Sequence, residues 1–184
     1  LFIAGRFMEL DYTTRRNLEL TETLRSGEKR GSLLWVLDKT KTPMGSRTLR
    51  SWLERPLLSV TAISKRNSAV AALVDNLIVR EELIAAMTGL GDMERLIGRI
   101  VYGSAGGRDL MALCRAMEKL PAVKQQLAAF PKGRLHALYE ELDTLEDLAA
   151  LIARTLVDEP PFSVREGELI RDGFDVRKRR RGGV

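Results

Sequence analysis

Residue types that commonly carry catalysis or bind metals are sparse in this 184-residue sequence. It contains one histidine, His136, and one cysteine, Cys114, whereas a zinc site generally needs three or four such ligands. Both residues lie in apolar helical patterns. We therefore expect His136 to be exposed or partly packed rather than a metal ligand, and Cys114 to be a buried thiol rather than a nucleophile. A single cysteine cannot form an internal disulfide, which fits a reducing cytoplasm.

Three further patterns resemble pieces of catalytic or phosphate-binding sites. Ser26 and Lys29 have a Ser-x-x-Lys spacing, but they lie in a polar loop without the accompanying motifs of the hydrolases that use it. The glycine-rich run Gly103–Gly107 has no preceding strand and no following Lys-Ser or Lys-Thr pair, so we expect it to connect two helices. A group of carboxylates beside the last apolar pattern should form a solvated face: Glu140, Glu141, Asp143, Glu146 and Asp147. The sequence thus predicts no catalytic centre, no cofactor and no metal in this chain.

The net charge of +5 comes from one short run near the end of the sequence. Without that run the chain has 25 basic and 25 acidic residues. A protein that grips duplex DNA concentrates Lys and Arg on the surface that meets the phosphates. Nonspecific contact with nucleic acid is therefore expected only from the run itself: Arg177, Lys178, Arg179, Arg180 and Arg181.

The helix predicted between Thr42 and Pro56 is the central element. Thr42 can accept a hydrogen bond from the first turn, and Pro43 suits the first helical position because its missing N–H costs nothing there. Pro56 should end the helix, since it pushes Arg55 out of the α region. At 100° per residue, one half of this helix should pack and the other should be polar. The packing half is Met44, Thr48, Leu49, Trp52 and Leu53, and the polar half is Ser46, Arg47, Arg50, Ser51 and Glu54.

Two residues of this helix carry explicit expectations about their contacts. Trp52 is placed in the core, so Trp52→Ala in the intact protein should cost about 3 to 5 kcal/mol. For Arg47 and Arg50 two interpretations stay open. Their guanidinium groups could bridge to carboxylates or helix ends of a neighbouring element. Alternatively they are exposed charges, whose surface pairs contribute under about 1 kcal/mol.

The rest of the sequence predicts an all-α, irregular multi-helix bundle. Hydrophobic residues make up 45% of the chain and aromatic residues only 5%, which favours an aliphatic core. No apolar window is long enough to cross a membrane. Trp35 should anchor the junction with the central helix. In the first half of the chain, helices are expected from a cap at Asp11 to residue 20, over 33–37 after Ser32, over 59–75, and from Glu81–Glu82 towards residue 90. In the second half, helices are expected from a cap at Asp92 to about residue 101, over 110–120 with a restart at Pro121, and as one straight helix over 135–156. A small extended hairpin is expected at 162–170.

Several sequence blocks together resemble a known family. They are Thr42-Pro43-Met44-Gly45 with Arg47, Leu49, Trp52-Leu53 and Pro56-Leu57, and, to either side, Asp11–Leu20, Ser32–Asp38, Asp92–Leu96 and Gly167–Phe174. In this order, from about residue 7 to 176, they are similar to the core domain of the MutS family of DNA mismatch-repair proteins. The resemblance points to structural or coupling roles for residues of the central helix: Thr42, Pro43, Gly45, Arg47, Leu49, Arg50, Trp52, Leu53 and Pro56.

The resemblance also implies a layout and a function. Residues 1–10 would be an arm from an upstream domain, 11–176 the first half of the helical core, and 177–184 a disordered basic tail or an unnatural end, because the family's lever helix does not follow Asp175. The fragment would be non-catalytic and would transmit conformational change between the ATPase and DNA-clamp regions of a cytoplasmic, dimeric, DNA-dependent ATPase. Its partners would be the connector, clamp and ATPase domains and, through the parent, duplex DNA, with ATP and Mg²⁺ bound outside this chain. The alternative is a nonspecific nucleic-acid-binding module that uses the tail; an autonomous helical enzyme ranks last.

Overall fold

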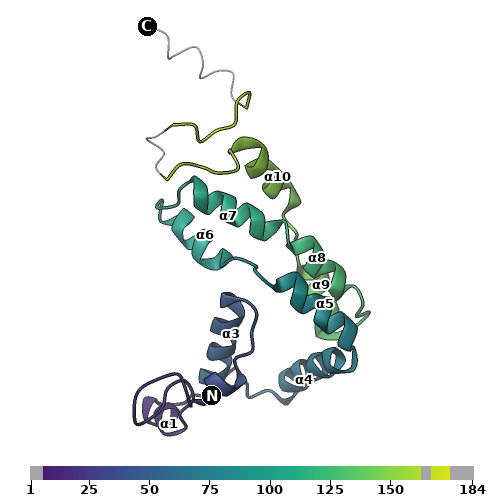
Figure 1. Ribbon diagram of the computed structural model, residues 1–184. Coiled ribbons are helices and arrows are strands. Elements are labelled where there is room, and N and C mark those ends of the chain that lie inside the picture. The colour runs from purple at the N-terminus through teal and green to yellow at the C-terminus, as the bar shows by residue number, and fades with distance from the viewer. Residues whose placement is uncertain (1–5, 163–166, 175–184) are drawn as a thin grey trace, which may run out of the picture. The chain divides into compact units, whose positions relative to one another are not determined.

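The computed structural model describes residues 6–162 and 167–174, and these residues form an all-helical architecture (Figure 1). The helices are α1 (Tyr12–Asn17), α2 (Leu33–Leu37), α3 (Pro43–Glu54), α4 (Val60–Asp75), α5 (Leu77–Met87), α6 (Met93–Val101), α7 (Gly107–Met117), α8 (Leu120–Leu127), α9 (Gly133–Glu141) and α10 (Glu146–Thr155). Extended pairing in the described residues is limited to two isolated antiparallel bridges, Phe7 with Leu57 and Leu156 with Ile170. The all-α class is confirmed. None of the described helices is long and apolar enough to cross a membrane.

Local capping explains where five of the helices begin. In each case a side-chain oxygen accepts a hydrogen bond from the backbone N–H three residues later, which satisfies one free donor of the first turn. The capping residues are Asp11, Ser32, Thr42, Ser59 and Asp92. The caps predicted at Asp11, Ser32, Thr42 and Asp92 are confirmed. The start expected near Glu81 is wrong, because α5 already begins at Leu77, and only Asn76 separates it from the end of α4.

The chain divides into two compact units. Unit 1 is Leu1–Gly89 with Gln125–Glu141, and unit 2 is Leu90–Lys124 with Leu142–Val184. The backbone therefore passes from one unit to the other three times, and the second passage lies inside α8. The restart of the helix at Pro121 is confirmed, since α7 ends at Met117 and α8 begins at Leu120.

Unit 2 is organised around α7, which contacts both α6 and α10 (Figure 1). Its core consists of Leu113, Cys114, Met117, Leu120 and Ala149. Cys114 is 0% exposed, and its Sγ lies 3.3 Å from the carbonyl oxygen of Ala149, to which it donates. Burial, together with the nearby Glu118 carboxylate, raises the pKa of the Cys114 thiol. The expected buried thiol is confirmed.

Unit 1 contains two sets of contacting helices. Helix α2 contacts α3, and α4 contacts both α5 and α9. The buried residues of this unit are Leu20, Ser32, Leu34, Leu83, Leu127, Phe130 and Leu135. Neither α3 nor α4 contains a buried residue. These two helices are thus packed on one side only, and their outer sides face solvent in this chain.

Both tryptophans are more exposed than the sequence suggested. Trp52 is 46% exposed and Trp35 is 48% exposed, so the expectations of a core Trp52 and of an anchoring Trp35 are wrong. In α2 the buried side chain is instead Leu34, at 2% exposure. The indole of Trp52 is covered on one face by the guanidinium of Arg66, 3.7 Å from the ring centroid. A ring with a polar edge and a cation over its face tolerates this position between core and solvent.

The single straight helix expected over 135–156 is wrong. Helix α9 ends at Glu141 and α10 begins at Glu146. Between them the Asp143 carboxylate accepts a hydrogen bond from the N–H of Leu145 at 2.9 Å, and Leu145 itself has φ of 53°. An Asp side chain that bonds to the backbone two residues later offers the chain a turn in place of a helical hydrogen bond. The apolar repeat continues through this turn, which is why spacing alone suggested one helix.

The hairpin expected at 162–170 falls partly on residues 163–166, which lie outside the described residues. Among those described, the second extended piece pairs with the end of α10. The N–H of Val157 donates to Leu169 O at 3.2 Å, and the N–H of Arg171 donates to Thr155 O at 2.9 Å. Residues 169–171 therefore lie beside the end of α10.

Candidate functional site

The start of α3 is built by Thr42, Pro43 and Gly45. The Thr42 hydroxyl oxygen accepts from the N–H of Gly45 at 3.0 Å, and Pro43 occupies the first turn. A Cβ at position 45 would lie 3.0 Å from Thr42 Oγ1 and 3.4 Å from Thr40 Cβ. A side chain at position 45 would therefore press on the capping hydroxyl, which would have to shift by a few tenths of an ångström.

A carboxylate just before α3 joins three segments of unit 1. Asp38 Oδ2 accepts from Lys29 Nζ at 2.6 Å and from Ser46 Oγ at 2.7 Å, and its Oδ1 accepts from Thr40 Oγ1 at 2.6 Å. The bond from Lys29, followed by those from Thr40 and Ser46, holds the pKa of Asp38 well below its usual range. Asp38 thus ties the loop before α2, the end of α2 and the first turn of α3 together. This role of Asp38 was not predicted from the sequence.

The polar half of α3 shows mainly local pairing. Arg50 Nε lies 2.9 Å from Glu54 Oε1, one turn along the same helix. For Arg50 the interpretation as an exposed residue with a surface pair is therefore supported, since this partner belongs to its own helix. Arg47 is partly buried, as are Leu49 and Leu53 on the packing half.

The end of α3 is held by the segment before α1. Arg55 leaves the helical region, with φ of −136° and ψ of 73°, directly before Pro56, as predicted. The carbonyl oxygen of Pro56 accepts from the N–H of Met8 at 2.8 Å, next to the bridge between Phe7 and Leu57. The described part of the expected arm over residues 1–10 thus lies against the end of the central helix.

A second built region, in unit 2, fastens the chain that follows α10. We call residues 156–162 and 167–171 the arginine-held segment. Arg171 Nε donates to the carbonyl oxygens of Ala153 (2.8 Å) and Leu156 (2.6 Å), and Arg171 also pairs with Asp158. These carbonyls belong to the last turn of α10 and the residue after it, where a cation is favourable.

Two arginines of α7 also bind this segment. Arg108 Nε donates to Pro160 O at 3.0 Å, and Arg115 Nη2 donates to Asp158 O at 3.1 Å. Gly107, at the start of α7, leaves no room for a side chain: a Cβ there would lie 2.3 Å from Leu169 Cδ1 and 2.8 Å from Pro160 Cβ. The segment therefore contacts α7 at its first turn, through Gly107 and Arg108, and again at its last turn, through Arg115.

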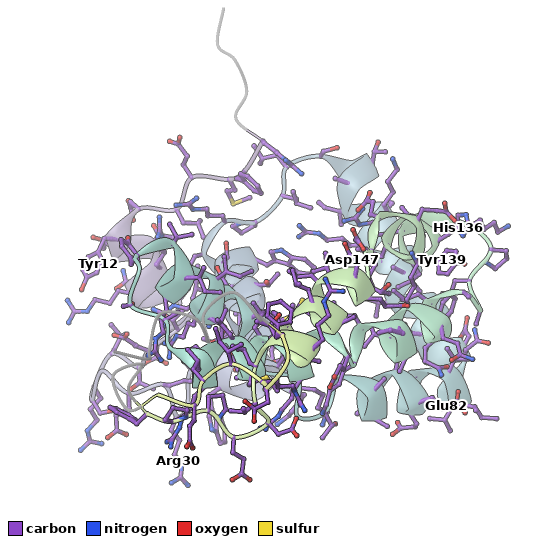
Figure 2. The ribbon with its side chains drawn as sticks, turned by 90° about the horizontal axis from the view of Figure 1, so that it is seen from above. Tyr12, Arg30, Glu82, His136, Tyr139 and Asp147 are labelled. Carbon is purple, nitrogen blue, oxygen red and sulfur yellow. The ribbon has the colours of Figure 1, made fainter. Side chains whose placement is uncertain are left out.

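The residues that resembled catalytic pieces do not form a centre. Ser26 Oγ lies 2.8 Å from Thr23 Oγ1, whereas the Lys29 ammonium binds Asp38. His136 stacks on Tyr139 with ring centroids 6.0 Å apart, one turn along α9 (Figure 2). The run Gly103–Gly107 joins α6 to α7, as expected. In the described ranges no three His, Cys, Asp or Glu side chains gather into a metal-binding cluster.

Comparison with known protein families assigns this chain to one of them. A model of the family MutS domain III matches residues 13–180, which is most of the chain. The chain belongs to the MutS domain III family.

Relatives agree with this assignment. The chain is 48% identical over 173 residues to the DNA mismatch repair protein MutS of Lachnoclostridium phytofermentans, covering 94% of this chain and 19% of that protein. The MutS of Desulforamulus reducens is 49% identical over 169 residues (92% and 20%), and that of Symbiobacterium thermophilum is 46% identical over 174 residues (95% and 20%). The chain thus spans about a fifth of the length of the relatives that it matches.

Within this MutS domain III chain, the predicted site residues group around α3, from the cap at Thr42 to the stop at Pro56. The basic run 177–181 lies outside the described residues. Sequence reasoning missed the arginine-held segment altogether. Apart from the pair of Arg171 with Asp158, its arginines bind backbone carbonyls, which leave no complementary residue type in the sequence as a signal.

Proposed function

We propose that this MutS domain III chain is the non-catalytic structural core of a DNA mismatch-recognition ATPase, and that it transmits conformational change between the ATPase and DNA-clamp regions of the parent protein. The family match over residues 13–180 carries this proposal. In it, ATP and Mg²⁺ bind outside this chain, and the parent acts as a dimer on duplex DNA in the cytoplasm. The partners of the chain are the connector, clamp and ATPase domains.

The packing of the two units supports a mechanical role. Close-packed helices resist gradual deformation and move as bodies, so a displacement at one end of a packed unit is felt at its other end. In unit 1, α3 is fixed in place by the cap at Thr42, by the bonds of Asp38 and by the pairing of Pro56 with Met8. In unit 2, the arginine-held segment is fixed to α7 and α10. The comparisons do not favour the alternative of a nonspecific nucleic-acid module that uses the basic tail.

Arg171→Ala in the intact protein tests the proposal. Removing this guanidinium deletes its contacts with Ala153, Leu156 and Asp158 and so loosens the segment at the end of α10, while every part outside this chain stays unchanged. We expect mismatch binding without nucleotide and basal ATP hydrolysis to stay close to wild type, and ATP-triggered release from the mismatch to slow several-fold. Stopped-flow fluorescence of a labelled mismatched duplex measures the release.

The matched control is Arg154→Ala, which removes an exposed arginine from the last turn of the same helix. It should leave all three quantities unchanged. If Arg171→Ala leaves release at the wild-type rate, or if hydrolysis and binding fall in parallel with release, the proposed transmission through this segment is wrong.

A further inference from the structure

A groove runs along α4 in unit 1, between this helix and the start of α9. It consists of two adjoining hollows of about 610 and 550 Å³, which share Lys65, Ala69, Arg134 and Leu135. The first hollow extends to Lys132 and Gly133, and the second extends to Trp52 and Arg66. We refer to both together as the α4–α9 groove.

The charged side chains that line this groove all have the same sign. Its ionisable lining residues are Arg6, Lys65, Arg66, Lys132 and Arg134, and neither hollow is lined by Asp or Glu. Among the described residues no carboxylate forms an ion pair with Lys65, Arg66 or Lys132, and Arg134 reaches only Glu141, at 3.4 Å. Clustered like charges in a hollow raise the local concentration of counter-ions. This groove therefore favours an anion.

The charge is also a property of unit 1 as a whole. Unit 1 holds 16 Lys and Arg against 12 Asp and Glu, whereas unit 2 without residues 177–181 holds 9 against 13. The neutrality of the body therefore conceals two units of opposite sign. The positive excess of unit 1 includes the cations that line the groove.

Backbone geometry adds to the potential at one end of the groove. Helix α9 begins at Gly133, which has φ of 84°, and the first hollow is lined by Lys132, Gly133 and Arg134. The N–H groups of a first helical turn carry partial positive charge and favour phosphate-like anions. Lys65 contributes from the facing helix, so the site combines two elements.

The second hollow of the groove is partly apolar and contains an aromatic ring. There the guanidinium of Arg66 lies over the half-exposed Trp52 indole, and Leu73 and Leu138 line the same hollow. Aromatic rings and guanidinium planes are the surfaces on which unstacked nucleobases pack. A ligand that matches both ends carries phosphate at one side and a planar ring at the other.

We propose that the α4–α9 groove binds a nucleotide, with phosphate at Lys65, Lys132 and the start of α9, and with the base against Trp52 and Arg66. A free nucleotide and a nucleotide of single-stranded DNA share this chemistry. Paired bases in a duplex are already stacked and do not expose a ring face to the groove. This proposal is independent of the transmission role of the chain, because it concerns a different surface.

Photo-cross-linking in the intact protein tests the proposal, since mapping by mass spectrometry separates this groove from any other nucleotide or DNA site. The probes are an azido-adenosine triphosphate and a short single-stranded oligonucleotide with 5-iodouracil. We expect cross-links on Trp52 or on peptides of residues 60–72 and 132–138. Labelling by one probe identifies the source of the nucleotide. Inorganic phosphate should compete more strongly than chloride of equal ionic strength.

Charge reversal supplies the second test. Lys65→Glu combined with Lys132→Glu should lower cross-linking at these peptides about tenfold or more. The matched control is Lys39→Glu with Lys41→Glu, two exposed lysines of the same unit outside the groove, which should not change it. No labelling of the groove by either probe overturns the proposal. An equal loss of cross-linking in both double variants also overturns it. Carbodiimide coupling of Lys65 or Lys132 to a carboxylate elsewhere in the protein does so too, because it would show that another part of the protein fills the groove.

Discussion

The hydroxyl of Ser46 donates a hydrogen bond to the carboxylate of Asp38 at 2.7 Å, and this bond joins the first turn of α3 to the residue that ends α2. The Lys29 ammonium and the Thr40 hydroxyl bind the same carboxylate. Bonds to a charged acceptor are stronger than those to a neutral one. The central helix is therefore oriented by a charged residue outside it as well as by its own cap.

Asp38→Asn should destabilise the chain by about 1 to 2 kcal/mol, because three donors lose a charged acceptor. Chemical denaturation followed by circular dichroism measures the change. Glu22→Gln, at an exposed acid of the same unit, is the control and should change stability by less than about 0.5 kcal/mol. Equal effects of the two substitutions would contradict the role given to Asp38.

The difference between wild type and Asp38→Asn should depend on pH in one direction. The folded-state pKa of Asp38 is lowered, so its contribution is complete above the unfolded-state value of about 3.9 and is lost as the pH falls towards the folded value. Denaturation midpoints should differ by a constant amount between pH 7 and 5, and should converge below about pH 4. A difference that grows on acidification would show that the pKa is not lowered.

Gly107→Ala should destabilise unit 2 by about 1 to 3 kcal/mol, because the added methyl would overlap Leu169 and Pro160. The control, Gly98→Ala in the interior of α6, meets no atom within 4 Å. It should stabilise the protein by about 0.5 to 1 kcal/mol through helix propensity. The two substitutions are chemically identical, so opposite signs in thermal or chemical unfolding are the decisive readout.

Trp52→Ala should cost about 1 to 2 kcal/mol, less than the 3 to 5 expected for a core tryptophan, because the ring is half-exposed. A double-mutant cycle with Arg66→Gln should return a coupling of about 0.5 to 1 kcal/mol for the stacked pair. Additive effects would mean that the guanidinium and the ring do not interact in solution. A loss above 3 kcal/mol would restore the core placement.

Cys114 should react with a disulfide reagent at least about a hundredfold more slowly in the folded chain than in denaturant. Its sulfur is fully buried and its pKa is raised, so both access and thiolate fraction are low. The reaction should accelerate in variants that loosen unit 2, such as Gly107→Ala. Rapid labelling of the native wild type would contradict the burial of α7.

Features encoded by neighbouring residues could be predicted from the sequence. The caps at Asp11, Ser32, Thr42 and Asp92, and the stop at Pro56, each depend on a side chain within a few residues of the backbone group that it affects. The buried Cys114 followed from apolar spacing.

Features that depend on distant partners could not be predicted in this way. The break at Asp143 interrupts a repeat that stays apolar on both sides, and the exposure of Trp52 depends on what covers α3. The cations of the α4–α9 groove come from parts of the sequence about 65 residues apart, such as Lys65 and Lys132. Only the fold brings them together.

The interleaving of the two units sets an order for synthesis. Helix α9 closes unit 1 against α4, yet it is translated after α6, α7 and most of α8, which belong to unit 2. While the ribosome elongates the chain, α4 must wait with an open side until the later segment emerges. A contact between such distant segments carries a large loop-closure cost. In this interval the nascent chain is therefore most accessible to chaperone binding and to proteolysis. Neither unit can be excised as one continuous stretch.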